Sequence, residues 1–166
     1  MLKTLKRIIQ EVNTINDLST ALNFVVDNVK EALYADACSI FIADDEHGEY
    51  IFAASNGLNT DLIGKTRLKF GVGLIGLVGK REEPINVADA SQQPEYQQVT
   101  AIGEQNLDGF MGVPVIYRGE LLGVMTVQQK RAACFEEEQE AFLVTLSAQL
   151  AGELARAMAK GKLQQL

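Results

Sequence analysis

Two apolar segments near the C-terminus, separated by only two residues, constrain the fold more than any other feature of this chain. Segments 110–117 and 120–129 are rich in valine, isoleucine, leucine and aromatic residues, and Arg118 and Gly119 lie between them. Two such segments joined by a short glycine-containing turn are typical of a β-hairpin. The sequence therefore predicts antiparallel pairing in this part of the chain.

The remaining predicted elements place helices at both ends of the chain. Apolar spacing predicts a helix in the first 15 residues and a second helix from a cap at Asn16 or Asp17 to about residue 34. Segments 37–43 and 50–54 are predicted strands, and a short strand at 66–70 precedes a short helix at 74–80. Residues 84–107 form a long connection with one helical turn near 100–105, and a long helix covers 135 to about 160. This order predicts an α+β domain whose antiparallel sheet carries the terminal helices on one face.

Length, charge and cysteine content narrow the class of protein. A chain of 166 residues suits a single domain spanning 1–166, and its net charge of −7 argues against nucleic-acid binding. The apolar segments are too short or too charged for a membrane span, and the N-terminus predicts an amphipathic helix instead of a signal peptide. Cys38 and Cys134 lack metal-site spacing. We therefore expect a cytoplasmic protein with no nucleic-acid or membrane partner.

Gly71, Gly73 and Gly76 form a G-x-G-x-x-G pattern, and Asp89 follows at the distance expected for a dinucleotide-binding fold. That function also needs a buried parallel strand before the glycines and a second βα unit after them. The preceding segment 65–70 alternates charged and apolar residues like a half-exposed strand, and no second βα unit follows, so the sequence does not favour the dinucleotide interpretation. Two interpretations remain: a tight strand-to-helix corner, or a helix start that binds an anion.

No group of residues in the sequence predicts catalysis. The single histidine, His47, lies in an acidic turn, and neither Ser39 nor Ser55 has a candidate base. Cys134 precedes a helix start, which would favour a thiolate, but the glutamates that follow it would oppose that effect. The calcium-loop and Walker patterns are absent as well. We expect no enzyme activity of this domain itself, no cofactor and no metal.

Three segments resemble the GAF domain family: the pattern G-x-G-x-x-G-x-V at 71–78, EPINVAD at 83–89 and GFMGVPVIYRGELLGVMTVQQ at 109–129. The resemblance covers about residues 17–159. It implies a central antiparallel sheet, terminal helices on one face and a small-molecule pocket under loops on the other. The motif of cyclic-nucleotide-binding members is absent.

The combination of FGVGLIGLVG at 70–79, EPINVADA at 83–90 and LLGVMTVQQ at 121–129 is similar to the N-terminal domain of the nitrogen-related phosphoenolpyruvate-protein phosphotransferases, which are paralogues of enzyme I. This closer resemblance implies a regulatory sensor domain excised from a longer chain. Phosphotransferase domains would follow it, and its ligand would be glutamine or 2-oxoglutarate.

Strand alternation predicts which residues would line such a pocket. The sheet face opposite the helices would present one set from the strands, and the glycine segment and the long connection would add a second. The two sets are Ser39, Phe41, Phe52, Phe110, Gly112 and Thr126, and then Gly73, Ile75, Val87, Asp89 and Tyr96. Apolar walls with a few polar groups are typical of ligand sites, but a closed second core is equally compatible with the pattern. The cations Arg67, Lys69 and Arg81 would either reach an anionic metabolite or lie on the solvated surface.

The last helix carries two stripes of residues. Leucines at 143, 146, 150 and 154 suit packing on the sheet, while small residues on another side suit close contact with a neighbouring helix. Together with the first helix, the second stripe predicts a homodimer interface of Leu5, Ile9, Ala148, Gly152, Ala155 and Ala159. The alternative is a solvent-exposed, alanine-rich helix face. A dimerisation module that binds no ligand is therefore the second functional hypothesis.

Overall fold

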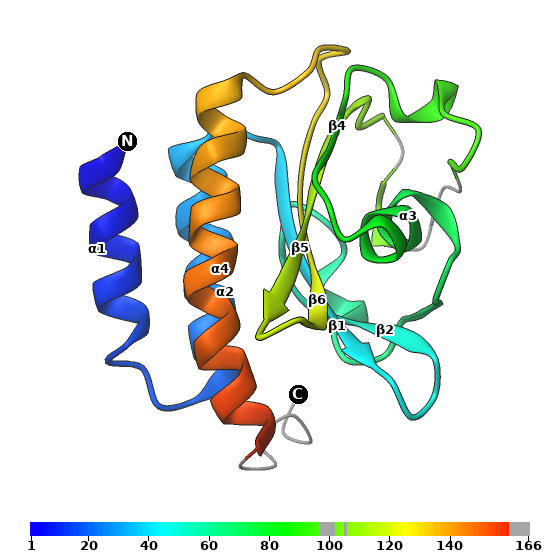
Figure 1. Ribbon diagram of the computed structural model, residues 1–166. Helices are drawn as coiled ribbons and strands as arrows, with labels where there is room; N and C mark the ends of the chain where they lie inside the picture. The colour runs from blue at the N-terminus through cyan, green and yellow to red at the C-terminus, as the bar shows by residue number, and fades with distance from the viewer. Residues whose placement is uncertain (97–101, 105, 160–166) are drawn as a thin grey trace.

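The computed structural model describes residues 1–96, 102–104 and 106–159. Its centre is a six-stranded sheet in the order β3-β2-β1-β6-β5-β4, and every neighbouring pair is antiparallel. Figure 1 shows this sheet between the helices α1, α2 and α4 on one side and α3 with the connecting segments on the other. The predicted α+β architecture is confirmed.

The predicted C-terminal hairpin is present as β5 (Gly109–Tyr117) and β6 (Glu120–Gln129). Both turn residues adopt left-handed backbone conformations, with φ of 49° at Arg118 and 80° at Gly119. Two consecutive positive φ values match the right-handed twist of the strands, which explains why two residues are enough for this turn.

The first hairpin contains a bulge that sets which side chains face each side of the sheet. It consists of β1 (Ala37–Asp44) and β2 (Glu49–Asn56), and the short edge strand β3 (Arg67–Lys69) pairs with β2. Ile40 lies opposite Ala54 and Phe41 lies opposite Phe52, so Ala53 is an extra residue in the ladder.

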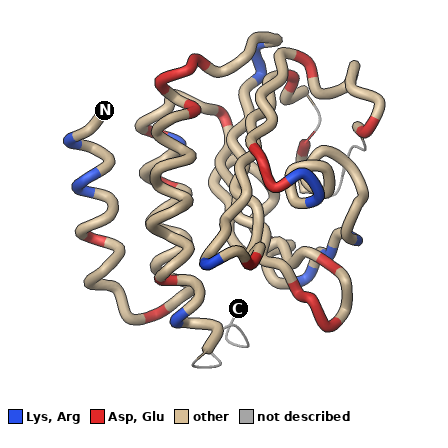
Figure 2. The backbone as a smooth tube through the Cα atoms, viewed as in Figure 1, with Lys and Arg blue, Asp and Glu red and all other residues tan. Residues whose placement is uncertain are grey.

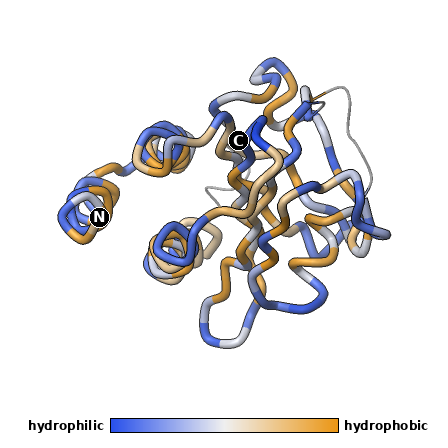
Figure 3. The backbone as a smooth tube through the Cα atoms, turned by 90° about the horizontal axis from the view of Figure 1, so that it is seen from above, coloured by the Kyte–Doolittle hydropathy of each residue, from blue (hydrophilic) through white to orange (hydrophobic). Residues whose placement is uncertain are grey.

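The helices build two layers behind the sheet. α2 (Leu18–Ala32) begins at the predicted cap, where an Asp17 side-chain oxygen accepts a hydrogen bond of 2.9 Å from the backbone N–H of Thr20. α2 and α4 (Glu137–Ala159) pack on the sheet. α1 (Leu2–Val12) contacts α2 and α4 from outside, and Figure 3 shows it as the outermost helix. The sequence predicted that these helices lie on the same face of the sheet, but it did not predict that α1 forms a second layer outside α2 and α4.

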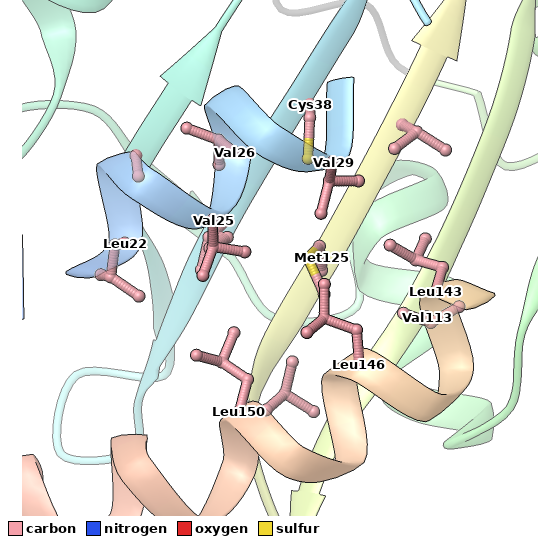
Figure 4. Packing of buried hydrophobic residues seen from close by; sticks show 14 of the residues in the cluster. Leu22, Val25, Val26, Val29, Cys38, Val113, Met125, Leu143, Leu146 and Leu150 are labelled. Atoms are coloured by element: carbon pink, nitrogen blue, oxygen red, sulfur yellow. The ribbon is translucent and has the colours of Figure 1, made fainter. Parts of the chain in front are cut away.

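The main core lies between α2, α4 and the back of the sheet. The four leucines of the predicted stripe, at positions 143, 146, 150 and 154, are all at least 97% buried there. Figure 4 shows Leu143, Leu146 and Leu150 facing Val25 and Val29 of α2 and Met125 of β6. Burial of this apolar surface is the main force that holds the helices to the sheet.

The front of the sheet is covered by α3 (Gly73–Arg81) and by connecting segments (Figure 1). Two 3-10 turns, η1 (Thr60–Leu62) and η2 (Ala90–Gln92), lie there. The strand β4 (Ile85–Val87) extends the sheet beside β5. β4 corrects the prediction of one long connection over 84–107, since three residues are too few to show a strand periodicity. The helical turn predicted near 100–105 lies largely outside the described residues.

Within the described part of the chain, none of the helices combines the length and the apolar character needed to cross a membrane.

Candidate ligand-binding cavity

A cavity of about 290 Å³ lies on the sheet face opposite α2 and α4. Its walls come from β3, the start of α3, η2, the segment between η2 and β5, and the two strands of the C-terminal hairpin. The lining residues are Arg67, Leu68, Lys69, Val72, Gly73, Leu74, Ile75, Ala90, Tyr96, Glu104, Phe110 and Gln128. The size suits a small metabolite with apolar and polar parts.

The glycine pattern builds the corner that places α3 against this cavity. Gly71 and Gly73 have φ values of 77° and 71°, which side chains disfavour. A Cβ atom at Gly76 would lie 2.7 Å from the carbonyl carbon of Gly71, so the helix can pass the corner only without a side chain there. This is the tight strand-to-helix corner of the first interpretation.

The same corner points the uncapped start of α3 toward the cavity. Val72 precedes the helix and provides no side-chain cap, and Gly73 and Leu74 of the first turn line the cavity wall. The first N–H groups of a helix lack intrahelical partners and carry the positive end of its dipole. The cavity wall formed by this turn therefore favours an anionic group.

Two cations of β3 add positive charge to the lining. The Arg67 guanidinium donates a hydrogen bond of 2.8 Å to the Asp44 carboxylate, and a Glu49 oxygen lies 3.6 Å away. Lys69 is exposed and has no ion-pair partner among the residues that the structure describes. Lys69 can therefore face a ligand carboxylate without first giving up an ion pair.

Another part of the cavity lining contains a carboxylate and a side-chain amide. Gln128 and Glu104 are buried, with 4% and 8% of their surface exposed. Burial raises the pKa of the Tyr96 phenol, and the nearby carboxylates of Glu104, Asp108 and Asp89 raise it further. The surroundings of Tyr96 are therefore electronegative, in contrast to the surroundings of β3 and the α3 start.

Four of the predicted pocket residues line this cavity: Gly73, Ile75, Tyr96 and Phe110. Three others, Ser39, Thr126 and Gly112, lie in one cross-strand row of β1, β6 and β5. The space above Gly112 is taken, since a Cβ atom there would lie 2.9 Å from Val78 of α3. The Ser39 hydroxyl is buried and hydrogen-bonded to Ser55 at 2.9 Å.

The other four predicted pocket residues lie around the cavity and not in its lining. Phe41 and Phe52 are fully buried and stacked, with ring centroids 5.4 Å apart. Val87 is half-buried on β4, and Asp89 caps η2 by accepting hydrogen bonds from the N–H and the hydroxyl of Ser91. The front face is thus a second core over most of its area, with a cavity at one side.

Gln128 and Glu104 were missed by the sequence analysis. The signal for Gln128 was available, because alternation from Val124 through Thr126 continues to the same face at position 128. Glu104 had no local signal. It reaches the cavity because the chain folds back there, with the N–H of Asn59 donating to the carbonyl of Ile102 at 2.8 Å.

The predicted dimer residues have unequal exposure. Leu5 is buried within the protomer, and Ile9 and Ala155 pack partly against the main core. On α4, Ala148 and Ala159 are exposed, Gly152 is half-buried beside Tyr117, and Val144 adds an exposed apolar side chain.

The turn between β1 and β2 forms an acidic cluster, seen in Figure 2 as a red segment at the lower right. One Asp44 oxygen lies 2.8 Å from His47 Nδ1 and 2.8 Å from Arg67 Nη1. Asp44, Glu46 and His47 lie close enough together to hold a metal ion, but Asp44 is already occupied by these two partners. The Arg67 and His47 contacts hold the pKa of Asp44 below its ordinary value of 3.8.

The lowered pKa of Asp44 predicts a pH-dependent loss of stability. Because its pKa is lower in the folded state, Asp44 stabilises the protein at pH values above 3.8. That contribution is lost as the pH falls through the folded-state pKa. Urea unfolding between pH 2 and 6 measures how the free energy of unfolding depends on pH. Asp44→Asn should make this dependence weaker, whereas Asp45→Asn should leave it unchanged. Equal profiles for the wild type and Asp44→Asn would contradict the prediction.

The two cysteines lie in different environments. Cys38 is buried in β1, and burial raises the pKa of its thiol, with a further contribution from Asp27. Cys134 is exposed, with its Sγ 3.9 Å from the carbonyl oxygen of Asn86. Neither thiol lines the cavity.

The fold matches that of a known family of domains. The family profile of the GAF domain matches residues 17–154, and the chain belongs to this family. The sequence is 37% identical over 156 residues to the phosphoenolpyruvate-dependent phosphotransferase system protein of Escherichia coli K12. That match covers 94% of this chain but only 21% of the relative, so the chain spans about a fifth of that protein's length.

Two solved structures agree with this assignment. The GAF domain of a phosphoenolpyruvate-protein phosphotransferase from Coxiella burnetii is 56% identical, with a TM-score of 0.93 over 96% of this chain and 95% of that one. The corresponding GAF domain from Acinetobacter is 42% identical, with a TM-score of 0.88 over 95% and 94% of the two chains. The chain is thus similar to GAF domains of phosphoenolpyruvate-protein phosphotransferases.

Proposed function

We propose that this domain binds a small, carboxylate-bearing metabolite in the cavity and thereby regulates a phosphoenolpyruvate-protein phosphotransferase. The observation that carries the proposal is that one part of the cavity lining is positively charged and another part offers hydrogen-bond acceptors. Cations of β3 and the uncapped start of α3 suit a carboxylate, whereas Glu104 and Gln128 suit hydrogen-bond donors. The apolar side chains between them, including Ile75 and Phe110, suit a short aliphatic chain.

The lining favours glutamine over 2-oxoglutarate. The carboxylate of glutamine would face Arg67 and Lys69, and its ammonium or amide hydrogens would face Glu104 and Gln128. With 2-oxoglutarate, a second carboxylate would approach the electronegative surroundings of Tyr96, where like charges repel. Charge complementarity of this kind selects between ligands of nearly equal size.

Calorimetric titration of this chain with glutamine and with 2-oxoglutarate tests the proposal. Glutamine should bind more tightly, and Lys69→Ala should weaken its binding about tenfold, the usual effect of losing a hydrogen bond to a charged group. Lys80→Ala is the matched control, because Lys80 is exposed at the far end of α3. Glu104→Gln should reduce the preference for glutamine. Absence of heat with either metabolite, in a folded sample, would end the ligand-sensing proposal.

The regulatory part of the proposal concerns a longer protein. We place this chain as the N-terminal domain of a cytoplasmic, nitrogen-related phosphotransferase, with the phosphorylated domains following it. The similarity to a relative about five times as long supports the part of this proposal that concerns a longer chain. Ligand binding would shift the population of conformations of the cavity wall around η2, and α4 would carry the change onward.

Self-association is the second candidate function. Val144 and Ala148 are exposed on α4, and the half-buried Gly152 and Ala155 follow them along the same face of the helix. The small residues of this face would allow a second helix to approach closely. The predicted homodimer would use this face together with the adjoining surface of α1.

The α4 interface makes a prediction for a charge substitution. Ala148→Glu should weaken the dimer about tenfold or more, because it places a carboxylate in an apolar helix contact. Asn23→Glu, on the exposed side of α2, adds the same charge elsewhere and should have no effect. Sedimentation velocity over a concentration series measures both variants. If Ala148→Glu sediments like the wild type, this face of α4 is not the interface.

A further inference from the structure

One amide side chain joins the edge strand β4 to the start of α4. Asn86 lies in the middle of β4, where Ile85 and Val87 face the front cluster and Asn86 points to the opposite side. Its Nδ2 donates to the carbonyl of Phe135 at 2.9 Å and to Glu140 Oε1 at 3.3 Å. Its Oδ1 accepts from the N–H of Phe135 at 2.9 Å. A single side chain thus satisfies both backbone groups of Phe135.

The same strand leads directly into the cavity wall. Ala90 lines the cavity four residues after Asn86, and its N–H donates to the Asp108 carbonyl at 2.7 Å. Asp89 holds η2 around Ala90 through hydrogen bonds from the Ser91 N–H at 3.1 Å and the Ser91 hydroxyl at 2.6 Å. The cavity wall at Ala90 and the Asn86 side chain are therefore joined by a short segment whose strand pairs with β5.

The Asn86 side chain contacts the start of α4, which is also held by the main core and by α2. Phe135 is 3% exposed and packs in the main core. Gln139 accepts from the N–H of Glu136 at 2.7 Å and donates to the carbonyl of Leu33 at 2.9 Å, which ties the first turn of α4 to the end of α2. The start of α4 is therefore held from two sides, by Asn86 and by Gln139.

We infer that Asn86 is a positioning residue that couples the cavity wall to α4. When the wall around Ala90 is loosened or tightened, the Asn86 hydrogen bonds pass the change to Phe135 and Glu140, and so alter the stability of the helix start. The role of a ligand in this coupling rests on the proposed function. The coupling itself is a property of the fold and can be measured without a ligand.

The test is a double-mutant cycle read by amide hydrogen exchange. Asp89→Ala removes the cap of η2 and loosens the cavity wall. With Asn86 present, this substitution should raise the exchange rates of amides 141–146 about fivefold. In the Asn86→Ala background, Asp89→Ala should leave those rates unchanged. A residue that merely stabilises the structure would give equal effects in both backgrounds.

Two further variants make the cycle decisive. Asn86→Asp keeps the acceptor for the Phe135 N–H but loses both donated bonds, so it should also reduce the coupling if Asn86→Ala does not fold. Gln129→Ala removes a 2.8 Å hydrogen bond to the Ala133 carbonyl in the turn before α4 and leaves Asn86 intact, so the Asp89→Ala effect should persist. The inference is overturned if Asp89→Ala acts equally with and without the Asn86 side chain, or does not affect α4 at all.

A final arm separates this inference from the proposed function. Saturating glutamine should slow exchange at 141–146 in the wild type and not in Asn86→Ala. If calorimetry shows that glutamine does not bind, the proposed function fails, while the Asp89 cycle still decides whether Asn86 couples the wall to α4. If glutamine binds and slows exchange equally in both proteins, the coupling inference fails and the sensor proposal stands.

Discussion

Replacing Ala90 with phenylalanine is expected to abolish glutamine binding, with an affinity loss of at least about a hundredfold. Ala90 is only 3% exposed and forms part of the cavity wall, so a ring at this position would take up space that a ligand needs. The domain should stay folded at a packing cost of about 1–3 kcal/mol, because the cavity can receive part of the new side chain. Calorimetry measures the affinity, and urea unfolding measures the cost.

The control for this substitution is Ala132→Phe. Ala132 is exposed in the turn before α4 and lies away from the cavity lining, so the same added ring should leave binding unchanged. Undiminished glutamine binding by a folded Ala90→Phe protein would show that the metabolite occupies another site. The cavity would then have to be abandoned as the basis of the proposed function.

Replacing Gly123 with alanine is expected to lower the free energy of unfolding by about 3 kcal/mol. A Cβ atom at this position would lie 2.3 Å from the carbonyl oxygen of Phe41 and 3.3 Å from the Cα of Ile42. These are backbone atoms in the central pair of strands, β1 and β6, so they cannot move aside without distorting the sheet. Urea denaturation monitored by circular dichroism measures the effect.

Gly119→Ala serves as the comparison. Gly119 has a φ of 80° but has no atom within 4 Å of the position that a Cβ would take. Its substitution should therefore cost only the backbone preference, about 1–2 kcal/mol. If Gly119→Ala destabilised the domain more than Gly123→Ala, the close packing of β1 against Gly123 would not be the dominant constraint.

The elements with strong periodicity were predictable from the sequence, as were the short strand at 66–70 and the short helix at 74–80, whereas β4 was not. The leucine stripe of α4, the Asp17 cap of α2 and the two-residue turn at Arg118 and Gly119 each correspond to a local physical preference, and all three are present. β4 has three residues, and its pairing with β5 decides its structure.

Residue alternation gives the side of a sheet but not what covers it. Alternation placed Ser39, Gly112 and Thr126 on the front face, where they pair across the strands. Whether that row borders a cavity depends on α3, and Val78 fills the space above Gly112. Glu104 illustrates the same limit, because its position depends on contacts between segments far apart in the sequence.

The extra residue in β2 limits how the length of this chain can vary among its relatives. Removing one of the adjacent alanines, Ala53 or Ala54, would make the ladder regular and leave Tyr50 and Phe52 on their present side. Removing Phe52 instead would place an alanine opposite Phe41 and take an aromatic ring out of the front cluster. We therefore expect single-residue deletions in this strand to be tolerated at the alanine pair, and other length changes to occur in the exposed turn at 45–48.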